Sequence, residues 1–368
     1  MAGTNGRQRI EKKKKDWEES CLKPALKRFG AKEPDARFYS PLDVKDFDFV
    51  DKVGFPGEYP YTAGTFPCPV PGSAPQKGSA EMGGGGGLVR AGRYSGYGTA
   101  EDTRDYFLQM QARGWKNGPR LAFDLPTQCG YDSDDPNAAG EVGVTGVAID
   151  TLQDMEALYQ AFTGDLELDK TASVFVINAT SGIIMAMYGA IAEKRGIPLN
   201  KMRATPQNDI LKEMLARGNY IFPPAESLRL AGDILHYVGQ NLPNYDAITV
   251  STYHQSEKGA SPVQEVIIGL ADAATYIQEA ISRGVNVDAI APSISFLTGC
   301  DSFAFFEEIA KHRAMRKMYA RMMRERFNAQ KPQSMTARFH AANGGVELTR
   351  EQYLNNITRS AIAALAAA

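Results

Sequence analysis

The residues whose types and spacing could do chemistry are concentrated in Arg203–Pro224, which reads RATPQNDILKEMLARGNYIFPP. The stretch opens polar and extended, places the amide of Gln207 at a turn, and continues over 209–217 with the apolar spacing of an amphipathic helix. A polar side chain at the carboxyl end of a strand, followed at once by a helix, is where α/β enzymes place substrate contacts. In the alternative reading, Gln207 only caps backbone groups at an ordinary strand-to-helix joint. These residues alone leave both readings open.

Further polar residues follow the other apolar runs: Thr127, Gln128, Asn178, Tyr253, His254, Ser295 and His340. His254 is the most suggestive, because it ends an alternating apolar run just before a polar loop. A histidine there can be a catalyst or a structural hydrogen-bonding group. The chain shows no Ser/His/Asp order, no paired carboxylates at glycosidase spacing and no HExxH, so we expect neither a hydrolase nor a metal site.

Six β-like runs must position these residues: Arg120–Leu125, Ala172–Asn178, Met202–Gln207, Ala247–His254, Ile290–Leu297 and Thr336–Ala341. Helical patterns separate them, at Gly182–Lys194, Ala225–Val238, Pro262–Arg283 and Phe303–Phe327. Strand starts about 30 to 50 residues apart are typical of βα units in a parallel sheet. We therefore predict an α/β fold of the (β/α)₈ TIM-barrel type. It is incomplete, because about six units are present where a closed barrel needs eight.

Composition narrows the possible functions. The chain has 368 residues, of which 43% are hydrophobic and 23% charged, which is ample for a buried core. A formal net charge of −2 gives no drive towards nucleic acid or an anionic membrane. The four cysteines are scattered, and no apolar run has membrane-spanning length. We expect a protein of the reducing cytoplasm.

The domain organisation predicted is an arm followed by the barrel. Residues 1–90 would form an N-terminal helix over Arg9–Arg28, an extended segment rich in Pro, Gly and aromatics, and a Gly-rich loop ending in Gly83–Gly87. Residues 91–368 would form the barrel, truncated at its C-terminus.

Several long phrases, in this order, resemble the large subunit of the coenzyme B12-dependent acyl-CoA mutases, the methylmalonyl-CoA mutase family. They are AFDLPTQCGYDSDDP, GEVGVTGVAIDTLQDMEAL, TPQNDILKEMLARGNYIFPP, YHQSEKGASPVQE and FFEEIAKHRAMRKMYARMMRERF. The similarity covers about residues 50–368.

The resemblance implies a radical carbon-skeleton rearrangement of an acyl-CoA bound along the barrel axis, with adenosylcobalamin covering the barrel mouth. It implies catalytic roles for Tyr94, Gln207 and His254, and it matches Arg217 to an arginine that pairs with a free substrate carboxylate. We also expect Thr205, Tyr253 and Ser295 to bind substrate and His340 to contact the cofactor. Because the isobutyryl and 2-hydroxyisobutyryl members of the family replace the tyrosine and the arginine, a dicarboxylic acyl group is favoured, most readily in methylmalonyl-CoA/succinyl-CoA interconversion.

This chain departs from the family pattern in three places. The region 64–93 is longer and lacks several basic and aromatic groups expected to contact CoA, for which Arg90 and Arg93 could compensate. Ser293 stands where the family has an arginine, and His340 is followed by Ala341 instead of cysteine. The Asp-x-His-x-x-Gly motif that ligates cobalt is absent, and His236 is expected to be a helix-surface or packing residue. We therefore expect no B12-binding domain in this chain and a cobalt ligand supplied by another domain or a small-subunit partner, in a hetero- or homo-oligomer.

Two alternatives remain open. The chain could be a non-catalytic or truncated mutase-like subunit with an assembly role, although Tyr94, Gln207, Arg217 and His254 are all retained. It could also be a mutase for another acyl-CoA, of the ethylmalonyl-, alkylsuccinyl- or hydroxyisobutyryl type.

Overall fold

A computed structural model describes residues 4–32, 40–44, 47–65 and 94–367. Contacts divide the chain into two compact units, Met1–Gly54 and Phe55–Ala368. The predicted Gly-rich loop, with Arg90 and Arg93, lies outside the described residues.

The first unit is mainly helical. The helix α1 (Thr4–Trp17) continues through a π-helical turn, Glu18–Leu22, into α2 (Lys23–Phe29), and α3 (Phe49–Lys52) follows separately. The helix predicted over Arg9–Arg28 is therefore confirmed. Pro24 is accommodated because it lies in the first turn of α2, where a missing amide hydrogen removes no helical bond.

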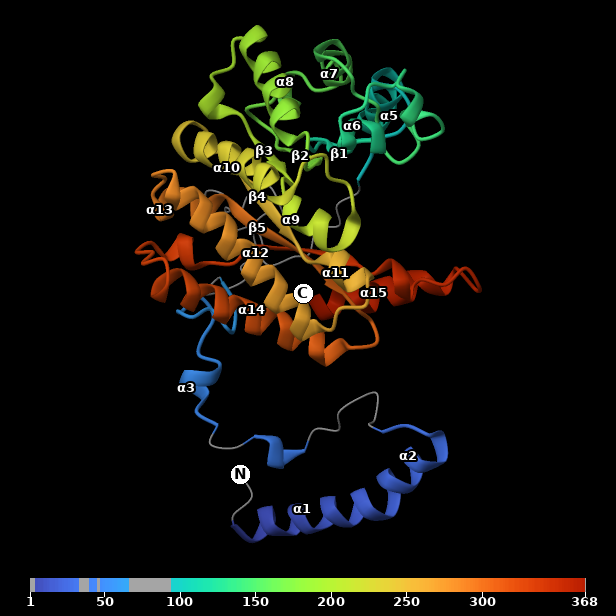
Figure 1. Ribbon diagram of the computed structural model, residues 1–368, viewed down its shortest axis with the longest axis vertical. Helices are drawn as coiled ribbons and strands as arrows, with labels where there is room; N and C mark the ends of the chain where they lie inside the picture. Colours follow the sequence, from blue (N-terminus) through green and yellow to red (C-terminus); the bar gives the residue numbers. More distant parts are fainter. Residues whose placement is uncertain (1–3, 33–39, 45–46, 66–93, 368) are drawn as a thin grey trace. The chain divides into compact units, whose positions relative to one another are not determined.

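The second unit is built on parallel strands, as predicted: β1 (Arg120–Ala122), β2 (Ser173–Val176), β3 (Ala204–Pro206), β4 (Ile248–Ser251), β5 (Ile294–Cys300) and β6 (Phe339–Asn343). Among the described residues they form two three-stranded sheets, in the orders β1-β2-β3 and β4-β5-β6 (Figure 1). Two backbone bonds join the sheets, from Asp246 N to Ala204 O at 2.8 Å and from Thr249 N to Gln207 O at 2.9 Å. The fold is thus mixed α/β with parallel sheets, and the strand order follows the chain.

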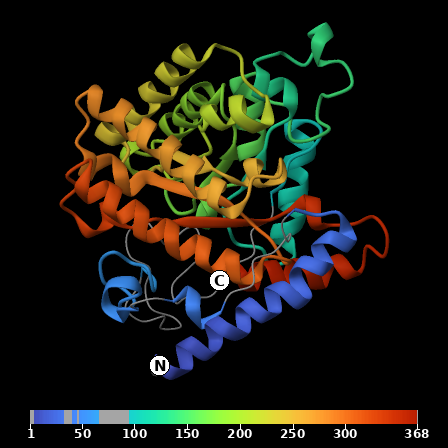
Figure 2. The ribbon, with the colours of Figure 1, turned by 60° about the horizontal axis from the view of Figure 1, so that its bottom comes forward.

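Helices precede and follow the strands: α5 (Ala100–Ala112), α6 (Leu125–Cys129), α7 (Leu152–Tyr159), α8 (Ser181–Lys194), α9 (Ile210–Lys212), α10 (Pro224–Asn241), α11 (Tyr253–Glu257), α12 (Pro262–Ser282), α13 (Val287–Ile290), α14 (Phe305–Glu325) and α15 (Asn355–Ala367). The helices α10, α12 and α14 lie side by side along the sheets (Figures 1 and 2). Thr99 and Ser261 begin α5 and α12 with capping boxes, so local sequence specifies where these helices start. No helix in the described part of the chain is long and apolar enough to cross a membrane.

The strands present two different faces, because successive side chains point to opposite sides. Leu121, Ile248 and Phe296 are almost completely buried in the hydrophobic core. The residues that alternate with them line a pocket instead; Val174, Thr205, Thr249 and Leu297 are examples. We call this second side of the strands the pocket face.

Two predicted elements end differently. The strand predicted over Ala247–His254 stops at Ser251, and His254 lies in the short helix α11. Thr252 has already turned into the helical region, with φ −94° and ψ −11°, so the strand cannot continue. The helix predicted over 209–217 is a single turn, α9, followed by a π-helical turn, Glu213–Arg217, which Gly218 ends with φ 99°.

Candidate active site

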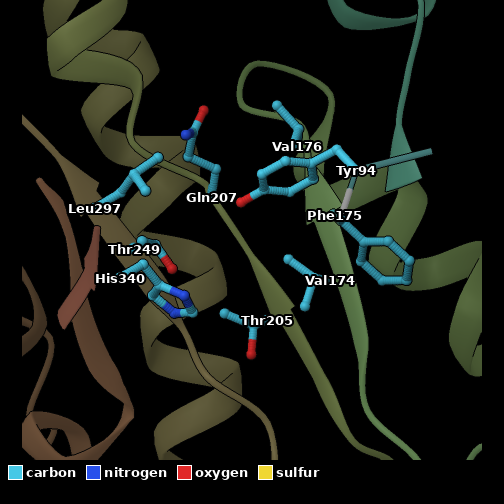
Figure 3. A pocket seen from close by; sticks show the side chains of 9 residues that line it. All are labelled: Tyr94, Val174, Phe175, Val176, Thr205, Gln207, Thr249, Leu297 and His340. Atoms are coloured by element: carbon cyan, nitrogen blue, oxygen red, sulfur yellow. The ribbon is translucent and has the colours of Figure 1, made fainter. Parts of the chain in front are cut away.

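Residues of both sheets form a pocket on this side of the strands. It is lined by Tyr94, Val174, Phe175, Val176, Thr205, Gln207, Thr249, Leu297 and His340 (Figure 3). Of the residues predicted from sequence, the structure thus brings together Tyr94, Thr205, Gln207 and His340. Tyr94 is 44% exposed, and its ring extends over the pocket.

The amide of Gln207 is oriented by two donors. Its Oε1 accepts hydrogen bonds from Asn178 Nδ2 at 3.0 Å and from Lys212 Nζ at 2.8 Å. Because both donors approach the oxygen, the amide nitrogen Nε2 is left to donate. No described residue accepts from Nε2, so Gln207 offers the pocket a hydrogen-bond donor.

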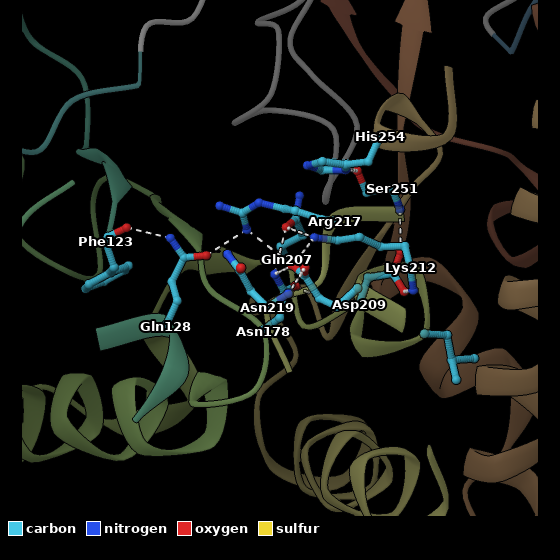
Figure 4. A network of polar contacts seen from close by, with 12 residues as sticks. Phe123, Gln128, Asn178, Gln207, Asp209, Lys212, Arg217, Asn219, Ser251 and His254 are labelled. Carbon is cyan, nitrogen blue, oxygen red and sulfur yellow. Dashed lines mark hydrogen bonds and ion pairs between the residues drawn. The ribbon is translucent and has the colours of Figure 1, made fainter. Parts of the chain in front are cut away.

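The carboxylate of Glu213 is buried and contacts four donors. Figure 4 shows the network of polar contacts around Gln207 and Arg217. Glu213 Oε1 accepts from Lys212 Nζ at 2.5 Å, from Asn178 Nδ2 at 2.6 Å and from Arg217 Nη1 at 3.2 Å. Its Oε2 accepts from the backbone N of Asn219 at 3.0 Å. A buried charge is tolerated only when paired and hydrogen-bonded, and this carboxylate is both.

Arg217 is held at one end of its guanidinium only. Nη1 donates to Gln128 Oε1 at 2.6 Å as well as to Glu213, and Gln128 is itself fixed by donating to Phe123 O at 2.6 Å. The arginine side chain is 24% exposed, and no described residue accepts from its Nε or Nη2. These two nitrogens form an unfilled fork of the kind that binds carboxylates.

Lys212 is completely buried, and its only side-chain acceptors among the described residues are Gln207 and Glu213. Burial lowers the pKa of Lys212 to about 8, against the opposing effect of Glu213 and Asp209. The group therefore stays charged at neutral pH and is close to titration above it.

His254 lies nearby and is neutral at physiological pH. Its Nδ1 is 2.9 Å from Ser251 Oγ, and Nε2 has no partner among the described residues. Burial, followed by the charges of Lys212 and Arg217, lowers the pKa of His254 to about 2. The imidazole can therefore donate a hydrogen bond without carrying a charge.

Asp209 connects these groups to the fold. Its Oδ2 accepts from the backbone N of Ser251 at 2.7 Å and its Oδ1 from Tyr276 OH at 2.8 Å. The carboxylate is fully buried and sits between the end of β4 and α12. It therefore fixes the chain segment that carries both Gln207 and His254.

The remaining predicted residues have supporting contacts. Thr205 Oγ1 donates to Asp246 Oδ2 at 3.1 Å, and Ser295 Oγ is 2.9 Å from Thr249 Oγ1, with Ser295 fully buried behind that pocket residue. Tyr253 packs edge-on against the His254 ring, with centroids 5.2 Å apart. His340 Nε2 is buried and has no described hydrogen-bond partner, and burial, with the charges of Arg120 and Arg338, lowers its pKa to about 3.

Lys212 and Glu213 were not expected in the site, because an amphipathic helix over 209–217 would carry both on the face opposite its apolar residues. The structure buries both completely, because the chain leaves the α-helical path at Glu213 and enters a π-helical turn. One feature of the sequence could have suggested a buried ion pair: Lys212 and Glu213 carry opposite charges, are adjacent, and closely follow a strand that ends in a polar residue.

No group of three or more His, Cys, Asp or Glu residues in the described ranges could hold a metal ion.

Comparison with known proteins places the chain in a family. A family profile described as methylmalonyl-CoA mutase matches residues 31–368. The 2-hydroxyisobutanoyl-CoA mutase large subunit of Aquincola tertiaricarbonis is 40% identical over 97% of this chain and 62% of its own length. The methylmalonyl-CoA mutase large subunit of Streptomyces virginiae is 36% identical over 89% of this chain and 42% of its length. The methylmalonyl-CoA mutase of Escherichia coli (strain K12) is 40% identical over 75% of this chain and 38% of its length. The chain thus spans less than two thirds of each of these relatives, and it belongs to the methylmalonyl-CoA mutase family.

Proposed function

We propose that this chain is the substrate-binding part of an adenosylcobalamin-dependent mutase that isomerises the carbon skeleton of a carboxylated acyl-CoA, most readily methylmalonyl-CoA/succinyl-CoA. The observation that supports a carboxylated substrate is the unfilled fork of Arg217. Glu213 and Gln128 hold Nη1 and leave Nε and Nη2 free among the described residues. Because Lys212 also pairs with Glu213, the cluster of Lys212, Glu213 and Arg217 keeps one net positive charge to attract an anion.

The thioester carbonyl would lie between Gln207 and His254. The Nε2 of Gln207 is available to donate, and so is Nε2 of His254 in the tautomer that carries hydrogen there. Two neutral donors stabilise charge that develops on a carbonyl oxygen without protonating it. Tyr253, packed on the His254 ring, would hold that ring in place, and Thr205 and Ser295 would support the wall beside the substrate.

Adenosylcobalamin, when bound, would supply the radical chemistry. Tyr94, exposed over the pocket, and His340, with an unpartnered buried Nε2, are the residues of this chain that fit a position facing it. The cobalt ligand would come from a separate B12-binding subunit or domain.

A different acyl group is the second candidate. The relative from Aquincola tertiaricarbonis, which matches 97% of this chain, carries a name that specifies 2-hydroxyisobutanoyl-CoA, an acyl group without a free carboxylate. Arg217 distinguishes the two candidates, because a hydroxyl group does not need a cationic fork.

The test is Arg217→Gln, with Arg113→Gln on the exposed end of α5 as the matched control. Both variants are assayed with a B12 subunit, adenosylcobalamin, methylmalonyl-CoA and 2-hydroxyisobutanoyl-CoA. Removing one partner of a desolvated charge pair costs about 2–5 kcal/mol, so Arg217→Gln should lower kcat/KM for methylmalonyl-CoA by about 30-fold or more and spare the hydroxyacyl substrate. An equal loss of kcat/KM on both substrates would contradict the proposal that Arg217 binds the substrate carboxylate.

A further inference from the structure

Arg120 is a cation on the pocket face that has no role in the proposed function. It is the first residue of β1 and pairs in register with Val174, a residue that lines the pocket. Leu121, the next residue along the strand, is fully buried in the core. Since successive strand residues point to opposite sides, Arg120 faces the same side as the pocket.

A second contact agrees with this placement. Ser95 pairs with Leu121 across a parallel bridge, with hydrogen bonds from Ser95 N to Arg120 O at 2.8 Å and from Ala122 N to Ser95 O at 2.9 Å. This register puts Tyr94 beside Arg120, and Tyr94 also lines the pocket. Arg120 therefore lies between two pocket residues, Tyr94 and Val174, on neighbouring segments.

The guanidinium of Arg120 is only partly exposed, and no described residue forms an ion pair or hydrogen bond with it. At the amino ends of the neighbouring strands, the carboxylate of Asp246 is already occupied by other partners. Asp246 accepts from Arg338 Nη2 at 2.8 Å and from Thr205 Oγ1 at 3.1 Å. The charge of Arg120 acts across the pocket, where it helps to lower the pKa of His340.

A partly buried arginine without a counterion favours the binding of an oxyanion, because the oxyanion accepts hydrogen bonds from the guanidinium and offsets its charge. We propose that Arg120 forms an oxyanion-binding site on the pocket face, separate from Arg217 and near the amino ends of the strands. Arg217 lies at the opposite, carboxyl ends, after β3. The proposal rests on the proposed function for its ligand: the oxyanion is a phosphate of CoA or, where the acyl group binds here instead of at Arg217, its single free carboxylate.

Four thioesters separate these sources: succinyl-CoA, propionyl-CoA, succinyl-pantetheine and propionyl-pantetheine. Their dissociation constants are measured by calorimetry on the purified chain, on Arg120→Gln and on Arg113→Gln, the exposed-arginine control. A hydrogen bond to a charged group contributes about 1.5–3 kcal/mol, so Arg120→Gln should weaken the affected ligands at least about tenfold. Losses confined to the two succinyl thioesters assign a carboxylate, and losses confined to the two CoA thioesters assign a phosphate.

Two results would overturn the proposal. One is unchanged binding of all four ligands by Arg120→Gln. The other is an equal loss on all four, propionyl-pantetheine included, since that ligand carries no anion. Circular dichroism and Tm confirm that Arg120→Gln is folded, and Arg120→Lys, which keeps the charge, should retain part of the affinity.

If the proposed function is wrong, the unmodified chain should bind none of the four thioesters, and this result is distinct from a loss of binding in Arg120→Gln alone. In that case succinate and pyrophosphate serve as probes, with Tm as the readout. Stabilisation of the unmodified chain by either anion, absent in Arg120→Gln and present in Arg113→Gln, supports the oxyanion site. Equal stabilisation of all three proteins, or of none, contradicts it.

Discussion

Gln207 presents a donor to the pocket only because Lys212 and Asn178 occupy its oxygen. The same lysine also bonds Glu213, which in turn holds Arg217. A single buried ammonium group therefore orients both the amide and, through Glu213, the guanidinium. At the scale of single residues, the geometry of the site depends on charges that never reach solvent.

Lys212→Met should be strongly destabilising, because it leaves the Glu213 carboxylate buried with one cation fewer. Breaking a buried pair by removing one partner costs about 3–5 kcal/mol of the free energy of unfolding. Urea denaturation at pH 7 measures this, with Lys201→Met, at an exposed position, as the control. The double variant Lys212→Met/Glu213→Gln should recover part of the loss, and a cost below about 1 kcal/mol for Lys212→Met would show that the pair is not needed.

His254→Ala should lower turnover about 10²-fold or more while leaving the fold intact, if its free Nε2 donates to the thioester oxygen. The pKa of about 2 adds a second expectation: protonation of His254 should not shape the pH–rate profile between pH 5 and 8. Activity that survives in His254→Ala, together with a lower Tm, would assign the histidine a structural role.

At the scale of elements, His312 joins β5 to α14. Its Nδ1 is 2.9 Å from the Glu308 carbonyl, which can only accept, so Nδ1 carries the hydrogen. In the neutral ring Nε2 is an acceptor, and it lies 2.9 Å from Thr298 Oγ1, which also donates to His340 O at 3.2 Å. Burial, with the charges of Lys311 and Arg316, lowers the pKa of His312 to about 4, so the folded protein keeps the ring neutral at physiological pH.

The burial of a neutral His312 between β5 and α14 predicts that acid lowers the stability of the protein. Between pH 6.5 and 4 the unfolded state binds a proton at His312 and the folded state does not, so stability should fall as pH falls through this window. From pH 6.5 to 5 the loss attributable to His312 is about 2 kcal/mol. Urea denaturation at both pH values should show that His312→Gln loses less than the unmodified protein. Glu308, whose pKa burial raises to about 7, acts in the opposite direction, so the comparison with the variant is needed to isolate the histidine. The same pH dependence in both proteins would contradict the assignment.

The elements themselves were predictable, and their ends were less so. All six strands were expected from runs of apolar residues at βα spacing; β1 to β4 were confirmed in shorter form, and β5 and β6 were confirmed with both ends shifted to later residues. The turn at Thr252 was missed because Thr, Tyr and His are compatible with a strand, and a single helical residue moves His254 onto α11. The π-helical turn at Glu213–Arg217 was missed because apolar spacing does not report a change of helical pitch.

The candidate site was predictable only in part. Of its pocket-lining residues, Gln207 and His340 were expected from strand ends, and Tyr94 and Thr205 were expected with the family resemblance. The buried charged residues Lys212 and Glu213 that support the site were not expected, since the sequence does not show which charged residues are buried.

At the scale of the molecule, the described residues include large apolar side chains that are highly exposed near the starts of α14 and α15. Phe303 and Phe306 are 80% and 82% exposed near the start of α14, and Tyr353 and Ile357 are 68% and 72% exposed at the start of α15. Exposed apolar residues in such density mark interaction surfaces. We expect the chain alone to associate, and sedimentation velocity should show oligomers that Phe306→Ser/Ile357→Ser reduces. A monodisperse monomer with high Tm would contradict this expectation.

The most direct test of the central claim is an isomerisation assay. The purified chain is combined with a B12-binding small subunit and adenosylcobalamin, and methylmalonyl-CoA, ethylmalonyl-CoA and 2-hydroxyisobutanoyl-CoA are supplied in parallel. We predict conversion of a carboxylated acyl-CoA, with methylmalonyl-CoA giving succinyl-CoA, and loss of that conversion in Arg217→Gln. Turnover of 2-hydroxyisobutanoyl-CoA alone would contradict the assigned substrate, and no turnover of any of them, by a complex shown to contain both subunits and cofactor, would contradict the claim that the chain is catalytic.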